Sequence, residues 1–420
     1  MEEVLLLKNE DRKLVPTSKA FVEELKKVTT IAAPMVVVTM SQYLLRIAPM
    51  IMVGHISELS LSSVAIATSL TNVTGYSQDP IVSVEAGKYA IWLIPSLFPY
   101  TILESMVPYL QTQSLILPML LCSTVTLSFH IPLCWALVFK SGLGTGGTAL
   151  AISLSYLLDV IMLGMYLSYS PACEKSRTSF SRDVFLSIGE FFRFAVPSAG
   201  MVCLEWWSFE LLVLLSGLLA NPELESSVLS ICLTTTSLHS LIPYSIGAVA
   251  STRVSNELGA GNPQAAQLAV CTVMVLAVAE AIVMIATLFC CRFILGYAYS
   301  DEKEVVDYVR EMTPLLCLSI IMDSLLAVLS GIARGSGWQH IGAYVNFGAY
   351  YLVGIPLAIV LGFVQNLRGK GIWGGIVTGS TVQAIVLTSA TCLINWQEQA
   401  NKARERIFKG RTSAESHLIS

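Results

Sequence analysis

The sequence has few charged residues. Lys, Arg, Asp and Glu make up 13% of its 420 residues, about half the share found in an ordinary soluble protein. The formal net charge is −4, so no basic excess points to a nucleic-acid partner. Hydrophobic residues reach 54%, and a composition this apolar and this poor in charge places the chain in a membrane.

Several motifs that would indicate specific chemistry are also missing. The sequence contains no Walker A or zincin motif, so neither ATP-driven transport nor metalloprotease activity has support. Most of the ten cysteines lie inside apolar runs without paired metal-ligand spacing, and we expect these to be reduced packing residues. Two G-x-G-x-x-G matches, at 142–147 and 369–374, begin apolar helices without a preceding strand and predict no dinucleotide site. We therefore expect no cofactor, no metal and no enzymatic activity.

Long apolar runs are the main feature of the chain. Each is close to the roughly 20 residues that cross a bilayer as a helix. The runs cover residues 31–54, 89–110, 115–139, 146–168, 191–219, 226–250, 267–291, 312–333, 340–364 and 372–395. The sequence therefore predicts an all-α polytopic membrane protein. Glycines at 371, 375 and 379, four residues apart, predict close packing of the last helix.

Basic residues gather in three clusters, which the positive-inside rule assigns to the cytoplasm. The clusters lie at 8–27, 175–182 and 402–411. Six long runs separate the second cluster from the third, and four separate the first from the second. A shorter run at 61–77 also follows the first cluster, but it is rich in Ser, Thr and Asn, and we expect that it does not span the membrane stably.

The two halves of the chain repeat each other's landmarks in the same order. The matching positions are Pro34 with Pro197, Pro95 with Pro314, Glu104 with Asp323, Pro132 with Pro356, and the glycines at 142, 144 and 147 with those at 369, 371 and 374. The separation between matches rises from about 168 at Tyr76 to 219 at Pro95, so about 51 residues are missing from the first half. Repeated helical halves are typical of secondary transporters, whose substrate cavity lies between the halves.

These observations predict two pseudo-symmetric helical lobes. We expect a cytoplasmic N-terminal tail (1–30), a truncated N-lobe (31–170), a cytoplasmic inter-lobe loop (171–190), a six-helix C-lobe (191–396) and a cytoplasmic C-terminal tail (397–420).

Carboxylates inside apolar helices are the strongest candidates for chemistry. Ionising such a group is costly, so Glu205 and Asp323 can load and release protons, although each also fits a structural ion pair or hydrogen bond. Glu210 lies five positions after Glu205, about 140° around the helix, and is a further proton-coupling candidate. His239 fits either a hydrogen-bonded helix histidine or a proton relay.

The segment Arg253-Val254-Ser255-Asn256-Glu257-Leu258-Gly259-Ala260-Gly261-Asn262-Pro263 resembles the loop signature of eukaryotic multidrug and toxic compound extrusion transporters. The segments at 53–59 and 197–207 resemble further motifs of that family, and the chain is similar to its plant detoxification branch from about residue 25 to 395. The resemblance implies two helical lobes and export of organic compounds in exchange for protons. It also implies that proton-coupling carboxylates of the second lobe map onto Glu205 and Asp323.

The leading hypothesis is a proton-coupled antiporter that exports organic cations, toxins or secondary metabolites across the plasma or vacuolar membrane. We expect its partners to be small organic substrates, protons and the lipid bilayer, and we expect a monomer. For substrate binding we select Trp206, Tyr244, Asn346 and Tyr350; the aromatic side chains can stack on a planar compound, or can serve as packing or interfacial anchors. The alternative is a non-transporting or regulatory truncated isoform.

Overall fold

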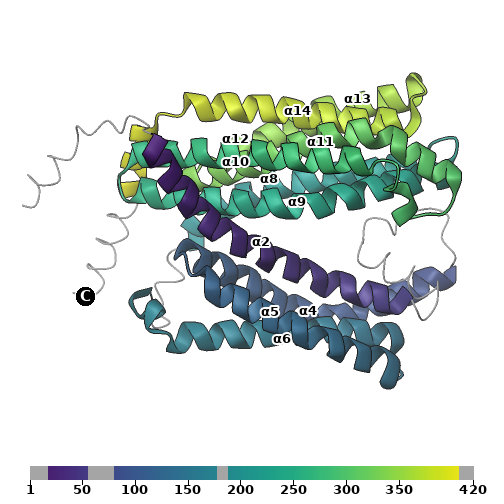
Figure 1. The fold of residues 1–420 in the computed structure, drawn as a ribbon, viewed down its shortest axis with the longest axis horizontal. Helices are drawn as coiled ribbons and strands as arrows, with labels where there is room; N and C mark the ends of the chain where they lie inside the picture. The colour runs from purple at the N-terminus through teal and green to yellow at the C-terminus, as the bar shows by residue number, and fades with distance from the viewer. Residues whose placement is uncertain (1–17, 55–79, 177–187, 406–420) are drawn as a thin grey trace, which may run out of the picture.

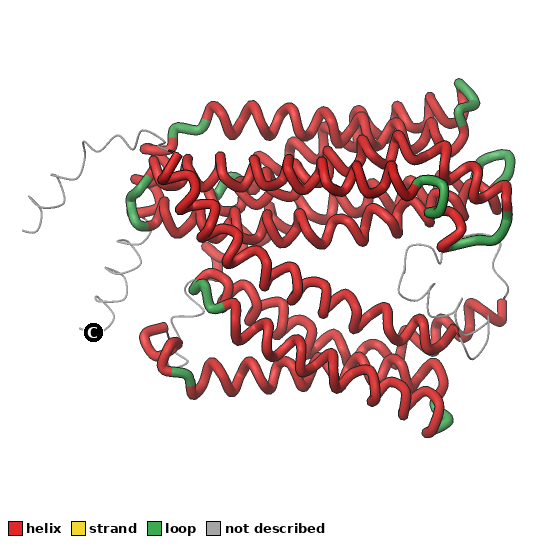
Figure 2. Tube along the Cα trace, viewed as in Figure 1, coloured by secondary structure: helices red, strands yellow, loops and turns green. Residues whose placement is uncertain are grey.

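The computed structural model describes residues 18–54, 80–176 and 188–405, and almost all of them are helical (Figure 2). The first-half helices are α2 (Ser18–Gly54), α4 (Pro80–Thr112), α5 (Ile116–Trp135) with its π-helical end η2 (Ala136–Lys140), and α6 (Gly144–Tyr169) followed by η3 (Pro171–Ser176). The second-half helices are α8 (Ile188–Ser216), α9 (Pro222–Gly259), α10 (Pro263–Cys291) followed by η4 (Gly296–Ala298), α11 (Lys303–Ser336), the continuous series α12 (Gln339–Asn346), η5 (Phe347–Gly354), α13 (Ile355–Ile359) and η6 (Val360–Val364), and α14 (Arg368–Leu393). A last helix covers residues 396–405.

Each of the ten predicted apolar runs corresponds to a helix or to a continuous helical series, although the runs at 191–219 and 372–395 extend two or three residues beyond the ends of α8 and α14. Nine stretches within the described residues are long and apolar enough to cross a membrane. The run inside α9 is not among them, since serines and threonines interrupt its apolar residues.

Helices extend into both of the segments predicted to be tails. Helix α2 begins at Ser18, inside the segment expected to be a tail, and residues 396–405 are helical as well. A membrane needs about 20 apolar residues, but a helix continues beyond them where Lys and Glu, which are good helix formers, replace the apolar side chains. Hydropathy therefore marked the membrane-spanning part and not the ends of the helices.

The helices form two bundles (Figure 1). Helices α8 to α14 make up one bundle, the second lobe, and α4, α5 and α6 make up the other. Helix α2 runs obliquely between the bundles and contacts α5 and α6 on one side and α9 and α10 on the other. The predicted two-lobed, all-α fold is confirmed.

The order of the helices places the predicted cytoplasmic segments at one end of the molecule. Helix α2 begins, α6 ends, α8 begins and α14 ends at that end, whereas α2 ends and α4 begins at the opposite end (Figure 1). Among the described residues, four long helices lie between the first two basic clusters, an even number, as two cytoplasmic ends require. The prediction for residues 61–77 lies outside the described residues.

The backbone shows the internal repeat, with one correction. The π-helical segments Ala136–Lys140 and Val360–Val364 coincide at a separation of 224 residues, as do Pro132 and Pro356. At the same separation, Gly142 and Gly144 match Asn366 and Arg368, and all four have positive φ.

The structure therefore matches Gly147 with Gly371, and the pairings of Gly142, Gly144 and Gly147 with Gly369, Gly371 and Gly374 were wrong. A Cβ on Gly147 would lie 2.4 Å from the carbonyl oxygen of Leu137, and a Cβ on Gly371 would lie 2.6 Å from that of Leu361, its equivalent in the repeat. Both segments contain several glycines, so an alignment that is shifted by three residues still pairs some glycines with glycines.

Small residues let helices of the second lobe touch through their backbones. A Cβ on Gly331 of α11 would lie 2.0 Å from the carbonyl oxygen of Gly247 on α9, and one on Gly335 would lie 2.5 Å from that of Ser251. A Cβ on Gly375 of α14 would likewise approach the Cα of Ala358 to 2.3 Å, which confirms the close packing predicted for α14.

Large apolar side chains cover the outside of both lobes. Examples are Phe98 with 73% of its surface exposed, Ile282 with 62% and Leu352 with 66%. Such a surface suits lipid, because in water a continuous apolar face would promote aggregation.

The lobes are joined by polar contacts near the end that carries the predicted cytoplasmic segments. Arg253 of α9 donates from Nε to Oε1 of Glu24 on α2 at 2.8 Å and from Nη2 to Oε2 at 3.0 Å. Gln111 of α4 donates to the carbonyl oxygen of Ala248 at 2.8 Å and to Oγ1 of Thr252 at 3.0 Å. We call these interactions the interlobe contact.

Candidate functional site

An amide network fixes Glu205 inside the second lobe. Asn346 of α12 donates from Nδ2 to the carbonyl oxygen of Met201 at 2.7 Å and more weakly to Oε2 of Glu205 at 3.5 Å. Gln383 of α14 donates from Nε2 to Oδ1 of Asn346 at 2.7 Å. Asn346 and Gln383 are fully buried, whereas Glu205 is half-buried. The carboxylate of Glu205 thus contacts the amide of Asn346, and the amide of Gln383 in turn orients Asn346.

Charges from α11 act on this carboxylate. Arg334 and Asp323 both interact electrostatically with Glu205, and Asp323 also interacts with His239 of α9. Like Glu205, Asp323 is half-buried. The two carboxylates selected from the sequence therefore belong to one electrostatic cluster. Their assignment to proton coupling remains a prediction.

The other selected residues lie in different surroundings. Trp206 exposes 58% of its surface and Tyr244 exposes 59%, so both are accessible to a ligand or to lipid. Tyr350 is fully buried and its hydroxyl lies 3.1 Å from Oγ of Ser380. Glu210 takes no part in the network around Glu205.

Sequence reasoning missed Gln383 and Arg334, because nothing in their local sequence indicates a partner on another helix. It also missed Glu280, which lies inside the apolar run 267–291 and satisfies the rule that selected Glu205. In the first lobe, Glu104 on α4 is exposed and does not join the cluster of the second lobe.

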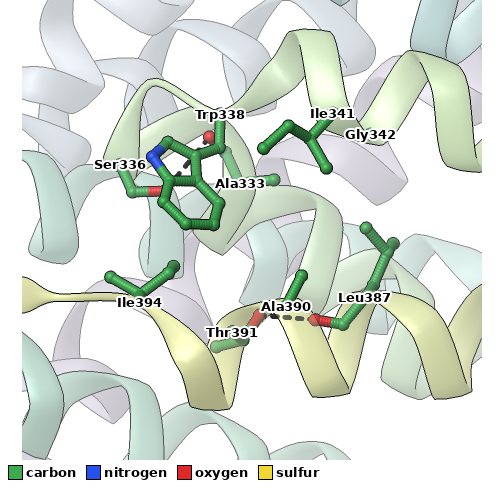
Figure 3. A pocket seen from close by; sticks show the side chains of 9 residues that line it. All are labelled: Ala333, Ser336, Trp338, Ile341, Gly342, Leu387, Ala390, Thr391 and Ile394. Atoms are coloured by element: carbon green, nitrogen blue, oxygen red, sulfur yellow. Dashed lines mark hydrogen bonds between the residues drawn. The ribbon is translucent and has the colours of Figure 1, made fainter.

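A small pocket lies where α11, α12 and α14 meet (Figure 3). Trp338, Ile341 and Leu387 line it together with small residues, and its cavity volume is about 10 Å³, close to the space that one water molecule needs. Pockets for drug-sized ligands usually hold about 300–1,000 Å³. We therefore do not assign the transported compound to this pocket.

Comparison with known proteins places this chain in a family. The profile of the MatE family matches residues 197–360. Protein DETOXIFICATION 14 of Arabidopsis thaliana is 48% identical over 474 aligned positions, which cover 98% of this chain and 98% of that protein. The chain belongs to the multidrug and toxic compound extrusion (MATE) family. Protein DETOXIFICATION 3 of the same plant is also 48% identical, over 97% of this chain and 98% of its own length.

Solved MATE structures agree with the fold. The crystal structure of the eukaryotic MATE transporter AtDTX14 has a TM-score of 0.89 and 49% identity, covering 92% of this chain and 100% of that chain. The Vibrio cholerae MATE transporter VcmN in its bent form has a TM-score of 0.71 at 11% identity, covers 92% of this chain and 99% of its own, and supports the fold alone.

These relationships make the chain an integral membrane protein and an efflux transporter of small organic substrates. The alignment with DETOXIFICATION 14 has 474 positions against 420 residues in this chain, so at least 54 positions have no residue of this chain opposite them.

Proposed function

We propose that this MATE transporter is a proton-coupled antiporter that exports organic cations, with Glu205 and Asp323 binding the protons. The observation that supports the proposal is the presence of both carboxylates, Glu205 and Asp323, in one cluster. Two carboxylates from α8 and α11 lie half-buried in one lobe and act on each other electrostatically. Ionisable groups inside membrane helices commonly mark ion or proton pathways.

The charges of the two carboxylates explain how a proton can be exchanged for an organic cation. With both groups ionised, the cluster attracts a cation, and the amide of Asn346 donates to the ionised Glu205. A proton on Glu205 removes the attraction to the cation and to Arg334 and weakens the hydrogen bond from Asn346. Proton binding and cation binding therefore exclude each other, which is the requirement for antiport.

Helix α8 is suited to respond to this change. Pro197 lies inside α8, eight residues before Glu205, where proline removes a backbone hydrogen bond and permits bending. When Glu205 no longer bonds to Asn346, the part of α8 beyond Met201 can shift relative to α12, while Asn346 still donates to the carbonyl oxygen of Met201. We propose that Trp206 and Tyr244, which expose more than half of their surface, contact the exported compound.

The test is proton-gradient-driven efflux of a fluorescent organic cation from sealed vesicles containing this chain. Glu205→Gln and Asp323→Asn should each abolish gradient-driven efflux, while Glu398→Gln, which changes an exposed carboxylate on the last helix, should leave it unchanged. Normal efflux by Glu205→Gln would remove Glu205 from the mechanism.

A second candidate function is a non-transporting isoform that regulates full-length relatives. It is favoured by the alignment that exceeds this chain by 54 positions and by the missing segment inferred from the repeat. We place that gap in the first lobe, after α2. Reduced efflux by a full-length homologue co-expressed with this chain would support regulation, and unchanged efflux would count against it.

A further inference from the structure

Three helices of the second lobe bring His239, Glu280 and Ser324 together. Nε2 of His239 on α9 lies 3.0 Å from Oε1 of Glu280 on α10. Oγ of Ser324 on α11 donates to Oε2 of Glu280 at 2.7 Å and lies 3.3 Å from Nε2 of His239. The side chains of His239 and Glu280 are only 2% and 10% exposed. We call these residues the His239 triad.

The hydrogen bonds fix where the protons lie. Ser324 has one hydroxyl proton, and that proton goes to Glu280. The contact between Ser324 and His239 therefore requires Nε2 to be the donor and Oγ the acceptor. Glu280 accepts from Ser324 either as a carboxylate or through the carbonyl oxygen of a carboxyl group. When it is a carboxylate and His239 is neutral, the imidazole carries its hydrogen on Nε2.

One buried atom of the triad, Nδ1 of His239, has no hydrogen-bond partner among the described residues. Oε1 of Glu280 makes no hydrogen bond there either, but it lies 3.0 Å from Nε2 of His239 as an ion-pair contact. With Glu280 ionised and His239 neutral, the triad carries a net charge of −1 inside an apolar lobe. A buried charge without full compensation is unfavourable. One added proton, on Nδ1 or on Oε1, makes the triad neutral, so the triad has a place for a single proton.

The triad also lies beside a proposed proton-coupling residue. Ser324 directly follows Asp323 in α11, and Asp323 interacts electrostatically with His239. The charged or titratable groups of this cluster come from five elements: Glu205 on α8, His239 and Tyr244 on α9, Glu280 on α10, Asp323 and Arg334 on α11, and Tyr350 on η5. A proton on the triad would change the potential at Asp323 without occupying it.

We propose that His239 and Glu280 form a third proton-binding site of the second lobe, held by Ser324 next to Asp323. The role of this site in transport rests on the proposed proton coupling, but its proton binding does not. A protonated triad favours the ionised form of Asp323, so it sets the order in which the lobe takes up protons. His239 and Glu280 act as positioning residues for Asp323.

Histidine NMR tests the site directly. Purified protein labelled with ¹⁵N in its histidines is titrated from pH 8 to pH 5, where an imidazole in water changes charge. The signal absent from His239→Gln should move from the neutral towards the cationic position, and in Glu280→Gln it should stay neutral throughout. His130 is the internal control, because it is a buried histidine of the first lobe whose Nδ1 is 2.8 Å from Oγ of Ser155. Its signal should be the same in both variants.

Infrared spectroscopy of the unchanged protein covers the case in which the proton resides on Glu280. The difference spectrum of the protein between pH 8 and pH 5 should then contain a carboxyl band, and this band should be absent from the spectrum of Glu280→Gln. If neither the His239 signal nor this band changes between pH 8 and pH 5, the third site does not exist, and this result needs no variant that folds poorly.

Efflux measurements separate this proposal from the proposed function. Glu280→Gln should shift the pH of half-maximal efflux by about one unit, as expected for the loss of a neighbouring charge, while His130→Gln should not shift it. An unchanged pH profile would overturn the role of the triad in transport. Absence of efflux from the unchanged chain, with histidine titration intact, would reject the antiporter and leave the proton site standing.

Discussion

At the residue scale, Asn346 connects three helices through a single amide. It donates to α8 at Met201 and Glu205 and accepts from Gln383 on α14, and none of its surface is exposed. Each buried donor or acceptor left without a partner costs about 1–3 kcal/mol. The position of Glu205 therefore depends on a residue that carries no charge.

Asn346→Ala should destabilise the second lobe by about 1–3 kcal/mol, because the carbonyl oxygen of Met201 and the Nε2 group of Gln383 lose their partner. Thermal unfolding of the purified protein measures the effect. The double variant Asn346→Ala, Gln383→Ala should cost less than the sum of the single variants, since contacting residues are not additive. Additive costs would show that the two amides act independently.

The sequence identified the carboxylates of this site but not their partners. Glu205 and Asp323 are conspicuous because charge is rare in an apolar helix, whereas Gln383 and Asn346 lie 37 residues apart and meet only after folding. Glu280 is also a carboxylate inside an apolar run, so the rule that selected Glu205 applies to it too, but it was not among the residues selected from the sequence.

At the element scale, the second lobe depends on the contact between α9 and α11. The two helices approach so closely that a single methyl group at Gly331 has no space beside Gly247. Gly348 in η5 provides the contrast, since nothing lies within 4 Å of the position that its Cβ would occupy.

Gly331→Ala should lower stability by at least about 1–3 kcal/mol, because the backbones of α9 and α11 would have to separate. Gly348→Ala should be neutral, or stabilising by up to about 1 kcal/mol, since alanine loses less conformational entropy than glycine in a helix. Melting temperatures of both variants in detergent check the comparison. Equal behaviour of the two would contradict the close approach of the helices.

The approximate positions of the long helices among the described residues could be predicted from apolar runs, but the ends of the helices and the register of the repeat could not. Hydropathy does not detect the polar first turns of α2. Identity matching paired Gly147 with Gly374, whereas the backbone pairs it with Gly371 through the contacts of Leu137 and Leu361. Steric contacts define the register more sharply than repeated glycines do.

At the scale of the whole molecule, the lobes are joined near one end. The first residue of the signature segment, Arg253, makes the bidentate pair with Glu24, so part of the motif serves the interlobe contact. Closer to the middle of α2, Thr39 lies 3.0 Å from Ser245 of α9, oxygen to oxygen. Alternating access requires these contacts to separate once in each cycle.

A disulfide between the lobes should therefore stop transport. In Thr39→Cys, Ser245→Cys the two sulfur atoms would replace oxygens that are 3.0 Å apart, a distance from which a disulfide can form with small adjustments. Oxidation should abolish efflux by the double variant and reduction should restore it, with each single variant as the control. Full efflux in the oxidised, cross-linked protein would show that this contact does not open.

The central claim is that this chain exchanges protons for an organic cation through the carboxylates of its second lobe. The most direct test is substrate-driven proton movement in liposomes that contain this chain alone and a pH-sensitive dye. An imposed gradient of the cation should drive protons in the opposite direction, and Glu205→Gln should remove that proton flux. Movement of the cation without any proton flux, or no flux of either in liposomes with the protein inserted, would contradict the account.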